Sequence, residues 1–160
     1  MLSMILAEIE FRRLNYADEA EVRAYIRLFW EIPLEHNEYF VARSEEFLAN
    51  WFRTACKTET PETTFSGIAL HHGQIIGIHL LRRFEEFETV GAHIAGLWVH
   101  PDYRGQGIAR TLKSQGEAWA RSVGATFLNT NVHPQNARML AINEEAGFSL
   151  FRLNLRKRLS

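Results

Sequence analysis

The chain has 160 residues, of which 46% are hydrophobic, and its formal net charge is −1 at pH 7. This length suits one globular domain over residues 1–160, and the balanced charge excludes a global field that would recruit nucleic acid or an anionic membrane. Cys56 is the single cysteine, so no intramolecular disulfide can form, which is typical of a reducing compartment.

The N-terminal segment predicts a strand rather than a targeting signal. Met1–Ile9 is apolar but lacks the basic region and the cleavage site of a signal peptide. No run in the chain approaches the roughly 20 apolar residues of a membrane helix. We therefore expect a cytoplasmic protein that begins with a strand over Ala7–Leu14.

Two amphipathic helices are expected next. Apolar residues at helical spacing predict helices over Glu19–Trp30 and Glu45–Lys57, with irregular structure over 34–41 between them. The N-caps are expected at Asp18 and Ser44, because a short polar side chain can accept from the first free amides of a helix.

A hairpin of two alternating strands follows, Thr63–Leu70 and Ile75–Phe84, with His71 and His72 in its turn. An adjacent histidine pair raises the question of a metal ion. Neighbouring strand residues point to opposite faces, and no carboxylate or cysteine completes a ligand set. We therefore expect exposed turn histidines and no metal.

The centre of the chain is an apolar strand that leads through a glycine-containing loop into a helix. Ala92–Val99 is apolar except for one histidine, and Pro101 stops the strand because proline has no amide donor. Helical spacing resumes over Ile108–Val123, so Gly105 and Gly107 lie where the helix begins.

This helix start suits a phosphorylated ligand. A helix N-terminus carries unpaired amide donors and positive potential, glycines let a diphosphate approach the backbone, and Arg104 and Arg110 add fixed charge. A Walker loop is disfavoured because no Lys-Ser/Thr pair follows Gly107. The dinucleotide motif is weakened because Arg110 stands where a third small residue is needed.

The C-terminal part predicts a strand, a short helix and a final strand. The strands are expected over Thr126–Val132 and Phe148–Leu159, and the helix starts at Pro134–Asn136 and ends before Gly147. Met139, Leu140 and Ile142 are expected to form the buried face of that helix. The element order predicts a mixed α/β domain with a mostly antiparallel sheet and one parallel pair.

Arg104-x-x-Gly107-x-Ala109, five residues after the valine that closes a strand, resembles the acetyl-coenzyme A signature of the GNAT N-acetyltransferases. Asn136, followed eleven and twelve residues later by Gly147 and Phe148, looks like the late Asn…Gly-Phe helix of that family. The resemblance implies the GNAT acyl-CoA N-acyltransferase fold, an α/β (α+β) architecture. Its fourth and fifth strands are parallel and splayed, and helices cover both faces of the sheet.

The resemblance also implies where acetyl-CoA, the cosubstrate, would bind. The backbone of the fourth strand would hold the pantetheine and the thioester carbonyl, the loop amides would hold the pyrophosphate, and an asparagine would bond the pantetheine arm from the other side. The expected cofactor-binding residues are Leu97, Trp98, Val99, Arg104, Gly105, Gln106, Gly107, Ile108, Ala109, Arg110 and Asn136.

His93 and Asn143 are the candidate catalytic residues. Some family members carry a catalytic glutamate where His93 stands, and histidine is suited to taking a proton from an amine. His93 shares a strand face with Val99 unless a bulge intervenes. Many family members have a tyrosine acid at the position of Asn143, and an amide can donate a hydrogen bond but no proton. His79 and His133 are weaker candidates for the base.

We therefore expect an N-acetyltransferase that transfers acetyl from acetyl-CoA to a small-molecule or peptide primary amine by direct attack in a ternary complex. Asn129 and Asn131 are expected to line the acceptor cleft. A non-catalytic acyl-CoA-binding or regulatory domain is the alternative, and the absence of the tyrosine favours it. Members of the family often form homodimers.

Overall fold

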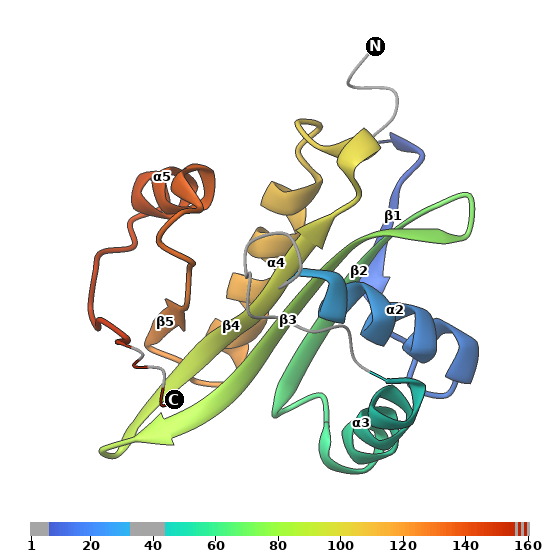
Figure 1. Ribbon diagram of the computed structural model, residues 1–160, viewed down its shortest axis with the longest axis horizontal. Helices are drawn as coiled ribbons and strands as arrows, with labels where there is room; N and C mark the ends of the chain where they lie inside the picture. Colours follow the sequence, from blue (N-terminus) through green and yellow to red (C-terminus); the bar gives the residue numbers. More distant parts are fainter. Residues whose placement is uncertain (1–6, 33–43, 156, 158, 160) are drawn as a thin grey trace.

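A five-stranded sheet, in the order β1-β2-β3-β4-β5, runs through the molecule (Figure 1). The computed structural model describes residues 7–32, 44–155, 157 and 159. The strands are β1 (Glu10–Arg13), β2 (Thr64–His71), β3 (Gln74–Glu86), β4 (Thr89–Val99) and β5 (Phe127–Thr130). The helices are α2 (Glu19–Glu31), α3 (Glu45–Thr58), the 3₁₀ turn η2 (Pro101–Tyr103), α4 (Ile108–Ser122) and α5 (Ala137–Glu145).

Helices cover both faces of this sheet. The pair β4–β5 is parallel and the other three pairs are antiparallel, as the sequence predicts. Ile68 on β2 packs with Val22 and Ile26 of α2, whereas the next residue, Ala69, packs with Ile108 and other residues of the α4 side. Because neighbouring strand residues face opposite ways, α2 and α4 lie on opposite faces.

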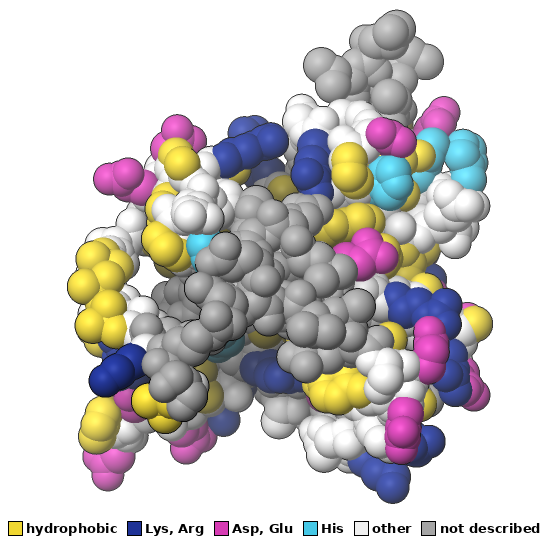
Figure 2. Space-filling view, viewed as in Figure 1, with side chains coloured by type: hydrophobic (Ala, Val, Ile, Leu, Met, Phe, Trp, Pro, Cys, Tyr) yellow, Lys and Arg dark blue, Asp and Glu magenta, His cyan; other side chains and the backbone are white. Residues whose placement is uncertain are grey.

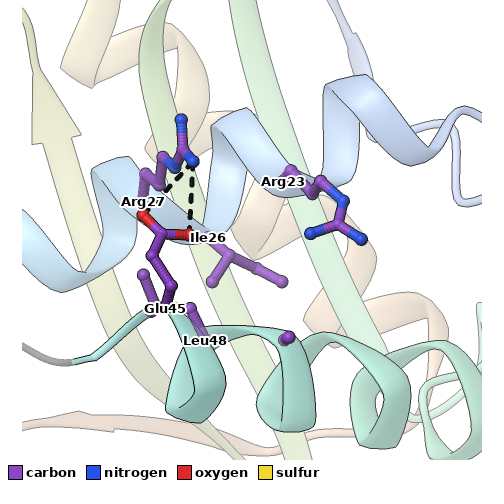
Figure 3. Close-up of a pocket in the computed structure, with 6 residues that line it drawn as sticks. Arg23, Ile26, Arg27, Glu45 and Leu48 are labelled. Carbon is purple, nitrogen blue, oxygen red and sulfur yellow. Dashed lines mark hydrogen bonds and ion pairs between the residues drawn. The ribbon is translucent and has the colours of Figure 1, made fainter.

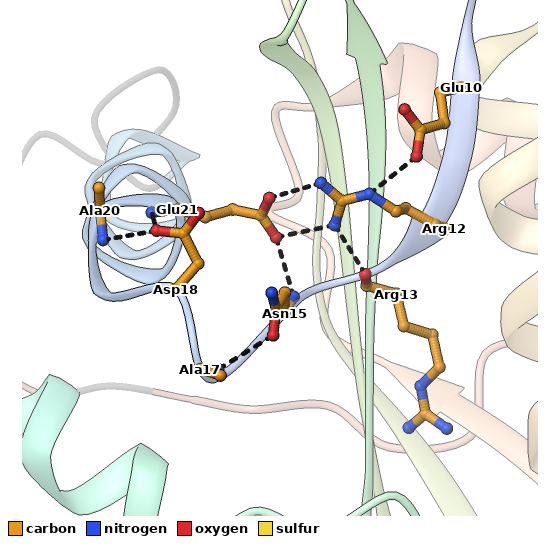
Figure 4. Close-up of polar contacts among 8 residues, drawn as sticks. All are labelled: Glu10, Arg12, Arg13, Asn15, Ala17, Asp18, Ala20 and Glu21. Carbon is orange, nitrogen blue, oxygen red and sulfur yellow. Dashed lines mark hydrogen bonds and ion pairs between the residues drawn. The ribbon is translucent and has the colours of Figure 1, made fainter.

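The connection from β1 to α2 is fixed by charge. The Asp18 side chain accepts from the amides of Ala20 and Glu21, which confirms it as the N-cap (Figure 4). Arg12 donates to both carboxylate oxygens of Glu21, at 2.8 and 2.5 Å. Its guanidinium lowers the pKa of the Glu21 carboxyl, and the Asn15 amide lowers it further. This pair holds the start of α2 against the edge of the sheet.

Glycines let α4 approach the other face closely. A Cβ built on Gly77 would lie 3.1 Å from both Ile108 and Leu112, and one on Gly116 would lie 2.9 Å from the His79 ring. Any side chain at these glycines would push α4 outward. The position of the α4 N-terminus therefore depends on them.

The C-terminal part departs from the sequence prediction. No strand is present over the described residues of 148–159, and Leu150, Phe151, Leu153, Leu155 and Leu159 are exposed. Leu150 and Phe151 are adjacent apolar residues, so they break the alternation of apolar and polar side chains that a strand needs. The edge strand β5 has only four residues, so it offers a short edge to a sixth strand. The predicted final strand is therefore wrong for these residues.

The buried face predicted for α5 is wrong at two of its three residues. Leu140 and Ile142 are exposed and Met139 is half-buried, whereas Asn143 is buried. The helix stands apart from the sheet, beside α4 (Figure 1), so it has a narrow contact surface. Its N-cap is Asn136, whose side chain accepts from the Met139 amide at 3.1 Å.

The two turn histidines do not lie on opposite faces. His72 has a φ of 50°, in the left-handed region, and this turns its ring to within 4.0 Å of the His71 ring, centroid to centroid. Glu8 from the N-terminal segment lies beside them, so the cluster does include a carboxylate. The prediction that the two rings point to opposite faces, with no carboxylate nearby, is therefore wrong. The sequence around His71 reveals neither the left-handed turn at His72 nor the pairing of β1 with β2.

Two other predictions concern parts that the structure leaves undescribed. The irregular segment over 34–41 and the side chain of Cys56 lie outside the described residues. Among the described helices, none is both long enough and apolar enough to cross a lipid bilayer.

His79 makes the fold sensitive to acid. It is 1% exposed on β3, its Nδ1 lies 3.0 Å from the Gly96 carbonyl oxygen, and burial lowers its pKa to about 4. The unfolded chain takes up this proton near the ordinary pKa of 6.5. Above pH 6.5 this histidine therefore costs no stability. As the pH falls from 6.5 towards 4, the free energy of unfolding decreases by about 3 kcal/mol.

Urea unfolding at a series of pH values measures this decline. We expect His79→Gln to flatten it, whereas His133→Gln, at an exposed histidine, keeps the wild-type slope. An unchanged slope in His79→Gln contradicts the assignment.

Candidate functional site

The site begins where β4 and β5 part. Their parallel pairing ends at Ile94↔Thr130. On the other side of β4, Leu80 pairs with Gly96 and Leu81 pairs with Ile94, so Ala95 is the extra residue of a β-bulge. Beyond the bulge, residues 96–99 pair with β3 but have no partner on the β5 side among the described strands. This leaves the β4 backbone open to a ligand that can pair with a strand edge.

The side chains of the open stretch are committed to the core. Leu97 and Val99 pack with Ile108 on the α4 face, and Trp98 packs with Ile78 on the α2 face. The backbone of these residues is therefore the part left for a ligand.

The loop after β4 is held by its own hydrogen bonds. The Arg104 guanidinium donates from Nε to the Val99 carbonyl oxygen at 2.9 Å, and the Arg104 amide donates to the Pro101 carbonyl oxygen at 3.2 Å. Gly105 and Gly107 have φ values of 80° and 86°, which explains glycine at both positions. A Cβ on Gly105 would meet no atom of the described residues within 4 Å, so they leave space above this glycine.

The N-terminus of α4 opens from this loop. Gly107 is its N-cap and offers no side chain to cap the helix, so among the described residues the first amide donors of α4 are left for a ligand. These donors belong to Ile108, Ala109 and Arg110, with the exposed Arg110 side chain beside them. This end of α4 can bind an anion.

Gln106 adds an unsatisfied acceptor to the loop. Its Nε2 donates to the Asp102 carbonyl oxygen at 3.3 Å, whereas its Oε1 is buried and has no hydrogen-bond partner among the described residues. A buried amide oxygen without a partner is unfavourable, and a ligand donor can relieve this cost.

His93 lies on the face opposite Val99, because the bulge at Ala95 changes the parity of the strand. It pairs with Arg82 of β3 and with Asn129 of β5, and its Nδ1 lies 2.5 Å from the Asn129 Oδ1. An amide oxygen only accepts, so Nδ1 is the donor in this contact, and in a neutral imidazole Nε2 then keeps a lone pair. The structure thus brings together two residues that the sequence singles out.

The face that carries His93 also carries a polar hollow. Arg82, which is paired with His93, lies 5.6 Å from the centroid of the Trp51 ring and donates to Glu59 at 2.9 Å. Arg82, Trp51 and Glu59 line the hollow together with Thr54, Thr58, Thr63, Thr64 and Arg83. The tryptophan lies on α3, so this helix contributes an aromatic side chain to the hollow.

A second hollow lies between α2 and α3 and is separate from the site. Figure 3 shows Ile26 and Leu48 inside it and Arg27 reaching Glu45 at 3.4 Å. None of the expected binding or catalytic residues lines it.

Asn143 contacts a lysine that sequence reasoning missed. The Lys113 Nζ donates to the Asn143 Oδ1 at 3.1 Å and lies 5.5 Å from the centroid of the Phe148 ring. Burial lowers the pKa of the Lys113 ammonium below its ordinary value. Lys113 projects from α4 near its N-terminal end, and nothing in its local sequence signals this role.

The two weaker candidates for the base have different surroundings. His79 is buried beneath α4, and His133 is exposed and accepts from the Gln135 amide at 3.3 Å. Asn136 directs its side-chain oxygen to the start of α5, so its amide nitrogen is the group left for a ligand.

Comparison with known proteins agrees with this geometry. A model of the acetyltransferase (GNAT) family matches residues 15–148. The chain belongs to this family. A curated relative, mycothiol acetyltransferase from Propionibacterium freudenreichii subsp. shermanii, is 30% identical over 78 residues. That match covers 49% of this chain and 25% of the relative, so the chain spans a minor part of that protein.

Solved structures share the fold over nearly the whole chain. An aminoglycoside acetyltransferase from an uncultured soil metagenomic sample, in complex with sisomicin, has a TM-score of 0.73 and 18% identity, covering 98% of this chain and 99% of that one. Glucosamine-6-phosphate N-acetyltransferase from Arabidopsis thaliana has a TM-score of 0.69 and 14% identity, covering 95% and 99%. At these identities the likeness establishes the GNAT fold.

Proposed function

We propose that this chain is an N-acetyltransferase that transfers acetyl from acetyl-CoA to a primary amine by direct attack in a ternary complex. The observation that carries the proposal is the continuity of the open β4 edge, the glycine loop and the uncapped α4 N-terminus. A coenzyme with amides in its arm and a diphosphate at its end has groups for each of these parts.

The binding residues divide by chemistry. Backbone groups of Leu97, Trp98 and Val99 pair with the pantetheine amides, and an amide aimed at the thioester oxygen stabilises the negative charge that develops there. The amides from Gly105 to Arg110 hold the pyrophosphate, whose charge the α4 N-terminus favours.

His93 is the proposed base. Asn129 holds its Nδ1 proton, so Nε2 is the atom that takes a proton from the attacking amine, directly or through a water molecule. The hollow that shares this face, lined by Trp51 and Glu59, is the proposed acceptor side. The names of the structural neighbours favour a small-molecule amine as the acceptor.

Lys113 is the proposed proton donor to the departing thiolate. It binds Asn143, which stands where related enzymes have a tyrosine acid, and its ammonium supplies the proton that an amide lacks. Desolvation makes this ammonium more acidic than an exposed lysine, which favours proton transfer.

Equilibrium binding tests the ligand. We expect acetyl-CoA to bind more tightly than ATP or NAD, and Arg110→Gln to weaken acetyl-CoA binding by roughly three- to tenfold because a charge beside the diphosphate is lost. Arg121→Gln, an exposed arginine at the other end of α4, is the matched control and should not change the affinity. Tight ATP binding without acetyl-CoA binding rejects the proposal.

Turnover separates an enzyme from a sensor. In a thiol-release assay over a panel of amines that includes aminoglycosides and amino sugars, we expect His93→Gln to lower kcat about 100-fold. Its Kd for acetyl-CoA should stay at the wild-type value, since His93 lies on the other face of β4 from the α4 core. Tight acetyl-CoA binding with no turnover on any amine indicates the regulatory alternative instead.

The pH profile of kcat tests Lys113. Deprotonation of its ammonium should produce an alkaline limb below the pH at which an ordinary lysine titrates. Lys113→Arg should move that limb to higher pH, because a guanidinium stays charged, and Lys113→Met should remove the limb and slow turnover about tenfold or more. A Lys113→Met profile identical to wild type would clear Lys113 of this role.

A further inference from the structure

The tip of the β2–β3 hairpin gathers three metal-ligating side chains. One ligand atom each of Glu8, His71 and His72 lies within 4.8 Å of the others. Figure 2 shows histidine and acidic side chains together at the upper right, over this tip. They lie at the end of the sheet opposite the Phe87–Glu88 turn, away from the proposed base.

Strand pairing brings the segment before β1 close to the histidines. The β1–β2 register ends at Glu10↔Leu70, so Glu8, two residues before β1, lies near the end of β2. The left-handed conformation of His72 turns its ring beside that of His71. The cluster therefore joins the segment before β1 to the turn after β2.

The spacing of the first pair suits a zinc ion. His71 Nε2 lies 3.5 Å from Glu8 Oε2. Two ligands that are each about 2.0–2.2 Å from a tetrahedral zinc ion lie roughly 3.3–3.5 Å apart. A small rotation of the exposed His72 side chain brings in the third ligand.

Tyr103 orients the central histidine. The Tyr103 hydroxyl lies 2.9 Å from His71 Nδ1, and the two rings meet edge to face with centroids 5.4 Å apart. When Nδ1 donates to this hydroxyl, Nε2 keeps the lone pair that binds a metal. The His71 side chain is only 15% exposed, so its ring is held in place before any ion arrives.

We propose that Glu8, His71 and His72 bind one divalent cation of the zinc class, with water completing the coordination. Two imidazoles and one carboxylate form a ligand set that suits zinc and disfavours magnesium or calcium. Tyr103 ends η2, immediately before Arg104, so the ion ties the β1–β2 edge to the start of the glycine loop. The site does not depend on the proposed acetyl transfer.

Zinc titration of the full chain, purified without a polyhistidine tag, tests the site. With zinc chloride and a competing chromophoric chelator, we expect one ion per chain. Glu8→Gln and His72→Gln should each weaken binding at least about tenfold, and Tyr103→Phe should weaken it through the loss of the His71 partner. His133→Gln is the matched control, because it removes an exposed histidine outside the cluster.

Three outcomes would overturn the site. They are no zinc binding to the wild-type chain, binding that survives His71→Gln combined with His72→Gln, and one ion per two chains. Circular dichroism of each metal-free variant shows whether it is folded, and Glu8→Gln, at an exposed side chain, tests the site if a histidine variant fails to fold.

Discussion

The parting of β4 from β5 is the constraint on which the rest of the site depends. Parallel pairing holds His93 beside Asn129, and it ends one residue later, at Ile94↔Thr130. The bulge at Ala95 divides β4 into two parts with different neighbours. Before the bulge the strand is held on both sides and can fix a side chain, and after it the strand has an open edge that can accept a ligand backbone.

The helix α4 gives this site its charge. Gly77 and Gly116 let α4 lie close against β3, and the helix begins at Ile108, directly after the glycine loop that follows β4. The same helix carries Lys113 to the side that faces α5. One rigid element thus places both an anion-binding end and a cation, so the distance between them is set by helix geometry rather than by a loop.

The features that the sequence predicts are local ones. The cap at Asp18, the glycines of the loop and the start of α4 each follow from the requirements of a few adjacent residues, and all three appear in the structure. The mixed sheet and its parallel pair follow from element order, because a helix must join two parallel neighbours.

The features that escape the sequence join distant segments. Lys113 and Asn143 are 30 residues apart, and Glu8 and His71 are 63 apart, so no local pattern connects them. The prediction of a final strand over 148–159 is wrong for a related reason. An alternating segment becomes a strand only when it can pair with a sheet edge of suitable length, and that edge is formed by a distant part of the chain. The face that carries His93 depends on one inserted residue, Ala95, which periodicity does not reveal.

The hydrogen bond from Arg104 to the Val99 carbonyl has a consequence for recognition. It fixes the loop to the strand that precedes it, together with the bond from the Arg104 amide to Pro101. The loss of backbone freedom in this loop therefore occurs when the chain folds and not when a ligand arrives. In the proposed complex with acetyl-CoA, the diphosphate would therefore meet amides that are already aligned, and less backbone freedom would be lost on binding.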